Sequence, residues 1–158
     1  MTSSYFYYNK RKVLQALRFH FFSRTEIKIM IVIVNLFAIF SAALYFTGKV
    51  SPLAFLLSST LWFALMFAFW YLLPVIIFRR EATFKDHFRV SFEDQHMFLE
   101  NERGSRSWPW KNFSDFVESS NFFHLYFNSR SFFIIPKTAF EKDHLYEIRK
   151  FLKGKIKK

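Results

Sequence analysis

The chain has 158 residues, of which 25 are Phe and none is Cys, and its formal net charge is +11. This length is typical of one domain, or of one domain with an anchor, and the lack of Cys excludes disulfide bonds, thiolate metal sites and thiol nucleophiles. Many aromatic residues combined with strong positive charge indicate a membrane protein or a nucleic-acid-binding protein.

A basic, aromatic segment occupies residues 1–28. Its stretch "YFYYNKRKVLQALRFHFF" predicts an amphipathic helix over residues 5–22. Such a helix beside a membrane span can lie among lipid headgroups, where Lys10, Arg11 and Arg18 would contact anionic lipid. The alternative is that the helix packs against the C-terminal domain, and the sequence leaves both arrangements open.

Two uncharged stretches, residues 29–46 and 52–78, predict a hairpin of transmembrane helices. The first, "IMIVIVNLFAIFSAALYF", would span about 27 Å as a helix, close to the hydrocarbon core of about 30 Å. In the second stretch, Pro52 fits the first turn of a helix and Pro74 would kink it. A cleaved signal peptide is the alternative for the first stretch, but its late start favours an uncleaved anchor.

Lys and Arg flank the predicted hairpin at its two outer ends, whereas the connecting loop holds only Lys49. Residues 29–78 would thus form the hairpin of a multi-pass protein. The positive-inside rule predicts that both termini of this protein lie in the cytoplasm. Asn35 is the strongly polar side chain of the first span. It is expected to hydrogen-bond within the hairpin, or alternatively to a helix of a partner protein.

Residues 79–158 change to a strand pattern. Alternation such as "FRVSF" and "HMFLEN", with turns such as "ERGS", predicts five or so short strands in an antiparallel sheet or partly closed barrel. The last strand should end at Pro136, which cannot donate to a ladder. Thr138 and Glu141 have capping-box spacing and predict the start of a C-terminal helix that covers the sheet. The apolar stripe of that helix consists of Leu145, Ile148, Leu152 and Ile156.

The run "SWPWKNFSDFVES", followed by "IIPKTAF" and a helix, resembles the C-terminal domain of the YcxB-like family over about residues 88–152. Members are bacterial membrane proteins with a basic N-terminal segment, two transmembrane helices and a small cytoplasmic domain. The resemblance implies an α+β protein of the inner (plasma) membrane whose pleckstrin-homology-like domain is a bent antiparallel sheet capped by a C-terminal helix. It assigns no catalytic residue. Pro109 departs from the pattern and indicates an edge strand or a bulge.

No motif supports catalysis, cofactor binding or metal binding. The three glycines are too scattered for a phosphate loop, and the His, Asp and Glu residues lack metal-site spacing. His124 lies in a predicted strand and is expected to be exposed or hydrogen-bonded, not an acid–base catalyst. At least one of Trp108 and Trp110 is expected in the core, and ligand contact by the pair is the alternative.

The charge is distributed in a way that disfavours nucleic acid as a partner. Residues 81–158 hold 14 Lys and Arg against 11 Asp and Glu, so the excess lies beside the predicted spans and in the tail. A phosphate-binding groove for nucleic acid would concentrate charge on the folded domain. The tail lysines could contact headgroups or be solvated at a helix end. They are Lys153, Lys155, Lys157 and Lys158.

These observations predict a membrane-anchored, non-enzymatic binding or regulatory module. Its cytoplasmic domain would bind a protein partner or lipid headgroups, and its hairpin would be surrounded by membrane lipids. No cofactor is expected. The alternative is an accessory subunit of an inner-membrane transporter or envelope-stress complex that acts through the hairpin. An enzyme would need a polar cluster that the sequence does not contain. The pattern indicates no particular oligomeric state.

Overall fold

The computed structural model describes residues 1–129 and 131–156, and the chain divides into two compact units. Unit 1 comprises Met1–Ala16 together with Glu81–Lys158, and unit 2 comprises Leu17–Arg80. The predicted basic segment, residues 1–28, is therefore shared between the two units. Helix α1 (Lys10–Ser23) contains the boundary.

Unit 2 contains the two predicted apolar helices. The first is α2 (Thr25–Phe46), and the second is a continuous run of α3 (Pro52–Phe67), the π-helical turn η1 (Ala68–Leu72) and α4 (Leu73–Arg80). Both are long and apolar enough to cross a membrane, with mean hydropathies of 2.5 and 2.2. Each extends beyond the uncharged stretch, because helical pairing continues into the flanking polar residues.

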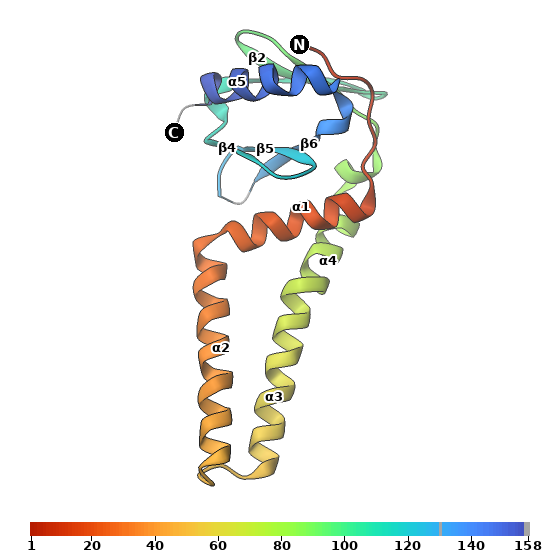
Figure 1. The fold of residues 1–158 in the computed structure, drawn as a ribbon. Helices are drawn as coiled ribbons and strands as arrows, with labels where there is room; N and C mark the ends of the chain where they lie inside the picture. Colours follow the sequence, from red (N-terminus) through yellow and green to blue (C-terminus); the bar gives the residue numbers. More distant parts are fainter. Residues whose placement is uncertain (130, 157–158) are drawn as a thin grey trace. The chain divides into compact units, whose positions relative to one another are not determined.

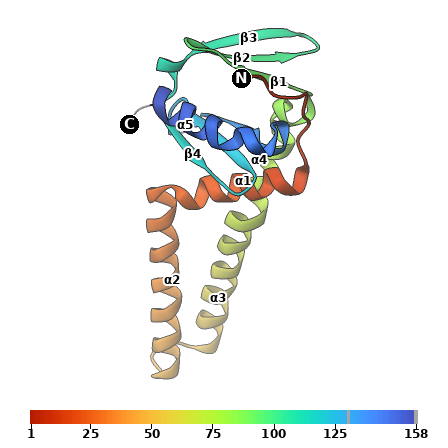
Figure 2. The same cartoon turned by 45° about the horizontal axis from the view of Figure 1, so that its top comes forward.

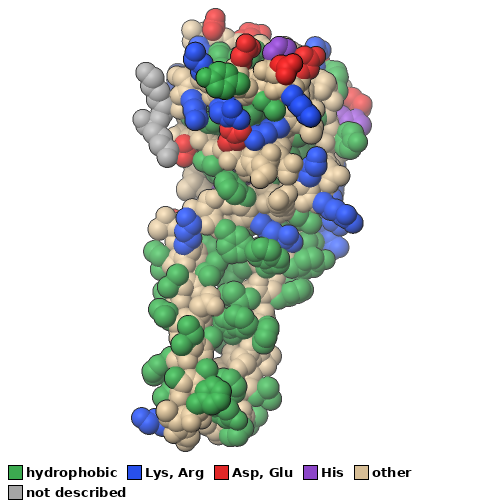
Figure 3. Space-filling view, viewed as in Figure 1, with side chains coloured by type: hydrophobic (Ala, Val, Ile, Leu, Met, Phe, Trp, Pro, Cys, Tyr) green, Lys and Arg blue, Asp and Glu red, His purple; other side chains and the backbone are tan. Residues whose placement is uncertain are grey.

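The helices of unit 2 contact one another but leave most of their apolar side chains exposed. Ser41 and Ser58 share a hydrogen bond of 2.7 Å between their hydroxyl groups, and the rings of Tyr45 and Phe55 stack at 4.5 Å. Large side chains such as Ile39 remain 66% exposed, and Figure 3 shows hydrophobic side chains over these helices. This surface would be costly in water and is typical of helices that meet lipid.

Pro74 removes a backbone donor from the second apolar helix, and Arg18 supplies a donor in its place. An α-helical residue at this position would donate its N–H to the carbonyl of Trp70, but proline has none. Instead, Arg18 Nε donates to that carbonyl at 2.9 Å, and the guanidinium lies 5.0 Å from the centre of the Trp70 ring. The π-helical turn ends at Leu72, two residues before Pro74, and such a turn is a common way for a helix to absorb this kind of change.

Unit 1 contains two three-stranded antiparallel sheets and a C-terminal helix, where the sequence predicted about five strands in one sheet or barrel (Figure 1). Strands β1 (Arg89–Phe92), β2 (His96–Asn101) and β3 (Gly104–Pro109) form the first sheet in that order. Strands β4 (Asp115–Glu118), β5 (Phe122–Tyr126) and β6 (Phe132–Pro136) form the second. Short 3-10 turns lie between these elements; they are η2 (Ala82–Lys85), η3 (Trp110–Asn112), η4 (Lys137–Ala139) and η5 (Lys142–His144).

Helix α5 (Leu145–Lys155) covers the core of unit 1 with the predicted apolar stripe. Ile148 and Leu152 of α5, and Ile156 directly after it, are at most 6% exposed, whereas Leu145 is half-buried. The ring of Phe151 contacts Phe92 of β1 and Trp110 of η3. The predicted role of the C-terminal helix as a cover for the strands is confirmed.

The predicted capping box at the start of this helix is wrong. Thr138 lies in η4, Phe140 is extended, and α5 begins only at Leu145 without a side-chain cap. The reason is tertiary packing, because the ring of Phe140 stacks on Phe92 at 5.7 Å and holds the chain away from helical geometry. A local capping signal is weaker than such a core contact.

The predicted helix over residues 5–22 is also corrected, because α1 begins at Lys10 and the residues before it are extended. Ser3 N donates to Val90 O at 2.8 Å, and Phe6 and Phe88 exchange two backbone hydrogen bonds. Residues 1–8, here called the N-terminal arm, therefore lie along β1 as an additional edge. For this part of the segment, the structure agrees with the alternative of packing on the C-terminal domain.

Candidate ligand-binding groove

A groove on unit 1 lies against the inner face of the β2–β3 hairpin, which Figure 2 shows as a long, projecting element of the first sheet. Ten residues from four regions of the chain line it. They are Thr83, Phe88, Leu99, Asn101, Arg103, Gly104, Ser105, Arg106, Trp108 and Phe133. The groove therefore combines cationic, polar and aromatic groups.

Strand register explains which side chains face the groove. Leu99 pairs with Arg106, and Met97 pairs with Trp108, so these four residues lie on one face of the sheet. Met97 is fully buried, whereas Arg106 is exposed. The same face is thus core at one end of the hairpin and open at the other.

The turn between β2 and β3 places a second arginine beside this open end. Gly104 has a φ of 144°, which an L side chain rarely adopts, so glycine is required there. Asn101 Oδ1 accepts a hydrogen bond of 3.0 Å from Arg103 N. The Arg103 guanidinium lies 3.2 Å from Asp86, but its side chain is 78% exposed and keeps other donors free for a ligand.

The groove is electropositive and has an aromatic wall. The Arg106 guanidinium lies 5.4 Å from the centre of the Trp108 ring, a geometry that holds the cation in place while leaving its N–H groups accessible. None of the described residues that line the groove is Asp or Glu. A ligand with a negatively charged, hydrogen-bond-accepting group fits this lining.

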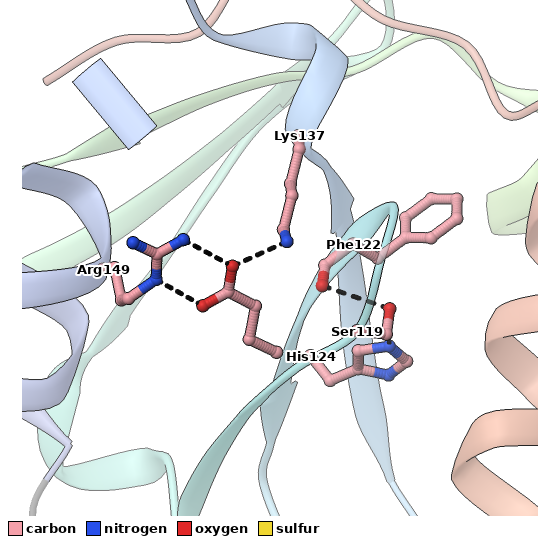
Figure 4. A network of polar contacts seen from close by, with 6 residues as sticks. Ser119, Phe122, His124, Lys137 and Arg149 are labelled. Atoms are coloured by element: carbon pink, nitrogen blue, oxygen red, sulfur yellow. Dashed lines mark hydrogen bonds and ion pairs between the residues drawn. The ribbon is translucent and has the colours of Figure 1, made fainter. Parts of the chain in front are cut away.

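A partly buried ion cluster joins β4, η4 and α5 (Figure 4). Glu118 of β4 receives two bonds from Arg149 of α5, at 2.5 and 2.8 Å, and Lys137 Nζ lies 2.6 Å away. Hydrogen bonding from Arg149, followed by the influence of Lys137, lowers the pKa of Glu118 to about 2 although burial opposes this shift. The cluster fixes α5 on the sheet, and it is a structural device.

This lowered pKa predicts acid sensitivity. Because the folded-state pKa is below the ordinary value, the contribution of Glu118 is present above about pH 4.5 and is lost as the pH falls toward 2. We expect Glu118→Gln to lower the free energy of unfolding at pH 7 by about 1–3 kcal/mol and to flatten its decline in acid. Denaturant titrations at several pH values measure both effects. Glu147→Gln, an exposed change on the same helix, is the control, and equal profiles would refute the prediction.

His124 is fully buried, so the expectation of exposure is wrong and that of hydrogen bonding is right. Its Nε2 lies 2.9 Å from Ser119 Oγ, as Figure 4 shows, and its ring stacks near Phe132. The residues of β5 from Phe122 to Leu125 are all buried, so both faces of the strand are covered. Within the described residues, no group of three or more His, Asp or Glu is arranged to hold a metal ion.

The residues predicted to contact lipid or a partner occupy different environments. Lys10, Arg11 and Lys153 are exposed, whereas Arg18 contacts Trp70. Lys155 forms an ion pair of 3.5 Å with Asp94. Asn35 Nδ2 donates to Ile31 O at 2.8 Å within its own helix. Lys157 and Lys158 lie outside the described residues.

The tryptophan pair separates into two roles. Trp110 is 6% exposed, and its Nε1 donates to Glu93 O at 2.8 Å, so it belongs to the core as expected. Trp108 is only partly buried and lines the groove. Pro109 ends β3, an edge strand, as its position in the sequence indicated. Arg103 and Arg106 were not among the predicted site residues. The two-residue spacing of Arg106 and Trp108 was the available signal, because it places both side chains on the apolar face of the strand.

Residues 92–152 match the family model described as YcxB-like protein. The match supports the resemblance and contains both the ion cluster and most of the groove. Comparisons with curated proteins and with solved structures found no significant match.

Proposed function

We propose that this chain is a membrane-anchored binding module of the YcxB-like type, without catalytic activity, in which unit 2 crosses the bilayer and unit 1 binds a ligand or partner. The observation that carries the proposal is the exposed apolar surface of the two long helices, which needs lipid as its solvent. The groove supplies a binding surface in the other unit.

The topology and the fold relationship are parts of the same proposal. Arg79 and Arg80 follow the second span and Arg24 precedes the first, which favours cytoplasmic termini in the bacterial inner membrane. The two antiparallel sheets and the covering helix α5 support a pleckstrin-homology-like relationship.

Membrane extraction and topology mapping test this proposal. We expect the full-length chain to remain in the pellet when membranes are washed with alkaline carbonate, and a C-terminal reporter to be active only in its cytoplasmic form. Release of the chain into the carbonate supernatant would refute the anchor. A reporter that is active on the outer side of the membrane would refute the orientation.

The accessory-subunit alternative has less support. Its polar contacts would come from the hairpin, but Asn35 already donates to Ile31 O, and Ser41 is bonded to Ser58. Ser59 and Thr60 donate to carbonyls one turn earlier in their own helix. Crosslinking from position 35 discriminates, because capture of one membrane protein there would favour the subunit role.

A further inference from the structure

We propose that the groove on the β2–β3 hairpin binds the phosphate of an anionic phospholipid headgroup. This inference rests on the proposed membrane anchoring, and it specifies the ligand of the same module. The chemical group that the groove would recognise is a phosphate ester, which phospholipid headgroups share with soluble phosphate esters.

The two arginines supply recognition of the phosphate. Arg106 is exposed and held over Trp108, and Arg103 retains free donors beside its ion pair with Asp86. Guanidinium groups bind phosphate oxygens through paired N–H donors, which gives stronger and more directional contacts than single donors. Asn101 and Ser105 add neutral polar groups at the same end of the groove.

The rest of the lining suits the lipid portion next to the phosphate. Leu99, Trp108 and Phe133 give the groove an apolar wall beside the cationic end. A free inorganic anion would gain nothing from these side chains, whereas the glycerol backbone and the first acyl carbons would bury apolar surface there.

A short stretch of chain links one groove residue to the end of the second apolar helix. Thr83 lines the groove and follows Arg80, the last residue of α4, by three positions. Three residues of extended chain reach at most about 11 Å. If the second apolar helix spans the membrane, Thr83 therefore stays within reach of the headgroup layer.

Native mass spectrometry of the full-length chain in detergent tests this inference with dihexanoyl-phosphatidylglycerol as the anionic probe. Dihexanoyl-phosphatidylcholine, which is zwitterionic and has no net charge, is the comparison. We expect preferential binding of the phosphatidylglycerol and a loss of about tenfold in apparent affinity for Arg106→Gln, the loss of a charged hydrogen-bonding partner. Asn101→Asp should weaken binding similarly, because it retains the acceptor for Arg103 N and adds a repelling charge. Lys150→Gln, the same charge change at an exposed position of α5, should bind as the unaltered chain does.

Three outcomes overturn the inference. Equal binding by Arg106→Gln, Asn101→Asp and the unaltered chain would exclude the groove. Equal binding of the two lipids would exclude recognition of net charge. Full competition by millimolar glycerol 3-phosphate would assign the groove to soluble phosphate esters. A chain that stays in carbonate-washed membranes yet fails this test would refute only the headgroup site, whereas carbonate release would refute the anchor itself.

Discussion

Replacing Tyr8 with alanine in the full-length chain is expected to destabilise unit 1 by about 3–5 kcal/mol, the range for removing a large buried aromatic side chain. Tyr8 is 7% exposed, and its ring packs edge-on against Phe84 at 5.3 Å and near Phe88. Its hydroxyl donates to Ile134 O of β6 at 2.7 Å. Burial also raises the pKa of this phenol, so the group stays protonated as a donor at neutral pH.

The neighbouring tyrosine gives a matched control. Tyr7 is 73% exposed, so Tyr7→Ala should change the free energy of unfolding by no more than about 0.5 kcal/mol. Tyr8→Phe keeps the ring and removes only the hydrogen bond, so its cost should be about 1–3 kcal/mol for the unpaired carbonyl. Denaturant unfolding followed by near-ultraviolet circular dichroism measures all three. Equal stability of the Tyr7 and Tyr8 alanine variants would show that the arm does not stabilise unit 1.

The arm also determines how unit 1 must fold. Residues 1–16 and 81–158 form one unit although the whole of unit 2 lies between them in the sequence. The backbone bonds from Ser3 to Val90 and from Ser4 to Ala139 therefore join segments that are far apart along the chain. Such contacts form only after the intervening chain has brought these distant segments together. Strand β1 therefore lacks its hydrogen-bonding partner on that side until the arm docks.

The sequence predicted the features that depend on local periodicity. The two apolar helices, most of the strands and the buried stripe of α5 follow from runs or spacings within a few residues. Features that depend on distant partners could not be found in this way. The sequence predicts helix for residues 5–8 of the arm because "YFYYN" has no alternation that reveals β1 as its neighbour. Phe140 breaks the capping box only because Phe92 lies beside it.

The candidate groove shows the same division between local and distant information. The residue type alone made Trp108 and Trp110 a candidate pair for ligand contact. Only Trp108 lines the groove, because Trp110 lies in the core. The more informative partner is Arg106, two residues earlier in the strand and beside the same ring. An arginine at an inward-facing position of a strand indicates, from the sequence alone, that this part of the face is open to solvent. Phe133 and Thr83 are distant in the sequence, and only the folded structure brings them to the groove.

A charge placed on the exposed surface of the hairpin should distinguish lipid from water as its solvent. Ile39 of α2 and Phe63 of α3 are both 66% exposed. In a bilayer, arginine near a helix centre costs about 2.5–3.5 kcal/mol, so Ile39→Arg and Phe63→Arg should each reduce the membrane-integrated fraction, and the double variant should reduce it further. On a surface exposed to water, the same changes would be nearly neutral or would improve solubility.

Ile39→Ala provides the control for loss of the side chain without added charge, and it should leave integration near that of the unaltered chain because an uncharged apolar residue remains compatible with lipid. Glycosylation-based insertion assays and carbonate extraction give the integrated fraction for each variant. If the arginine variants integrate as fully as Ile39→Ala, these positions do not face the hydrocarbon core. The exposed apolar surface would then require a protein partner to cover it, since an area of this kind is not stable in water.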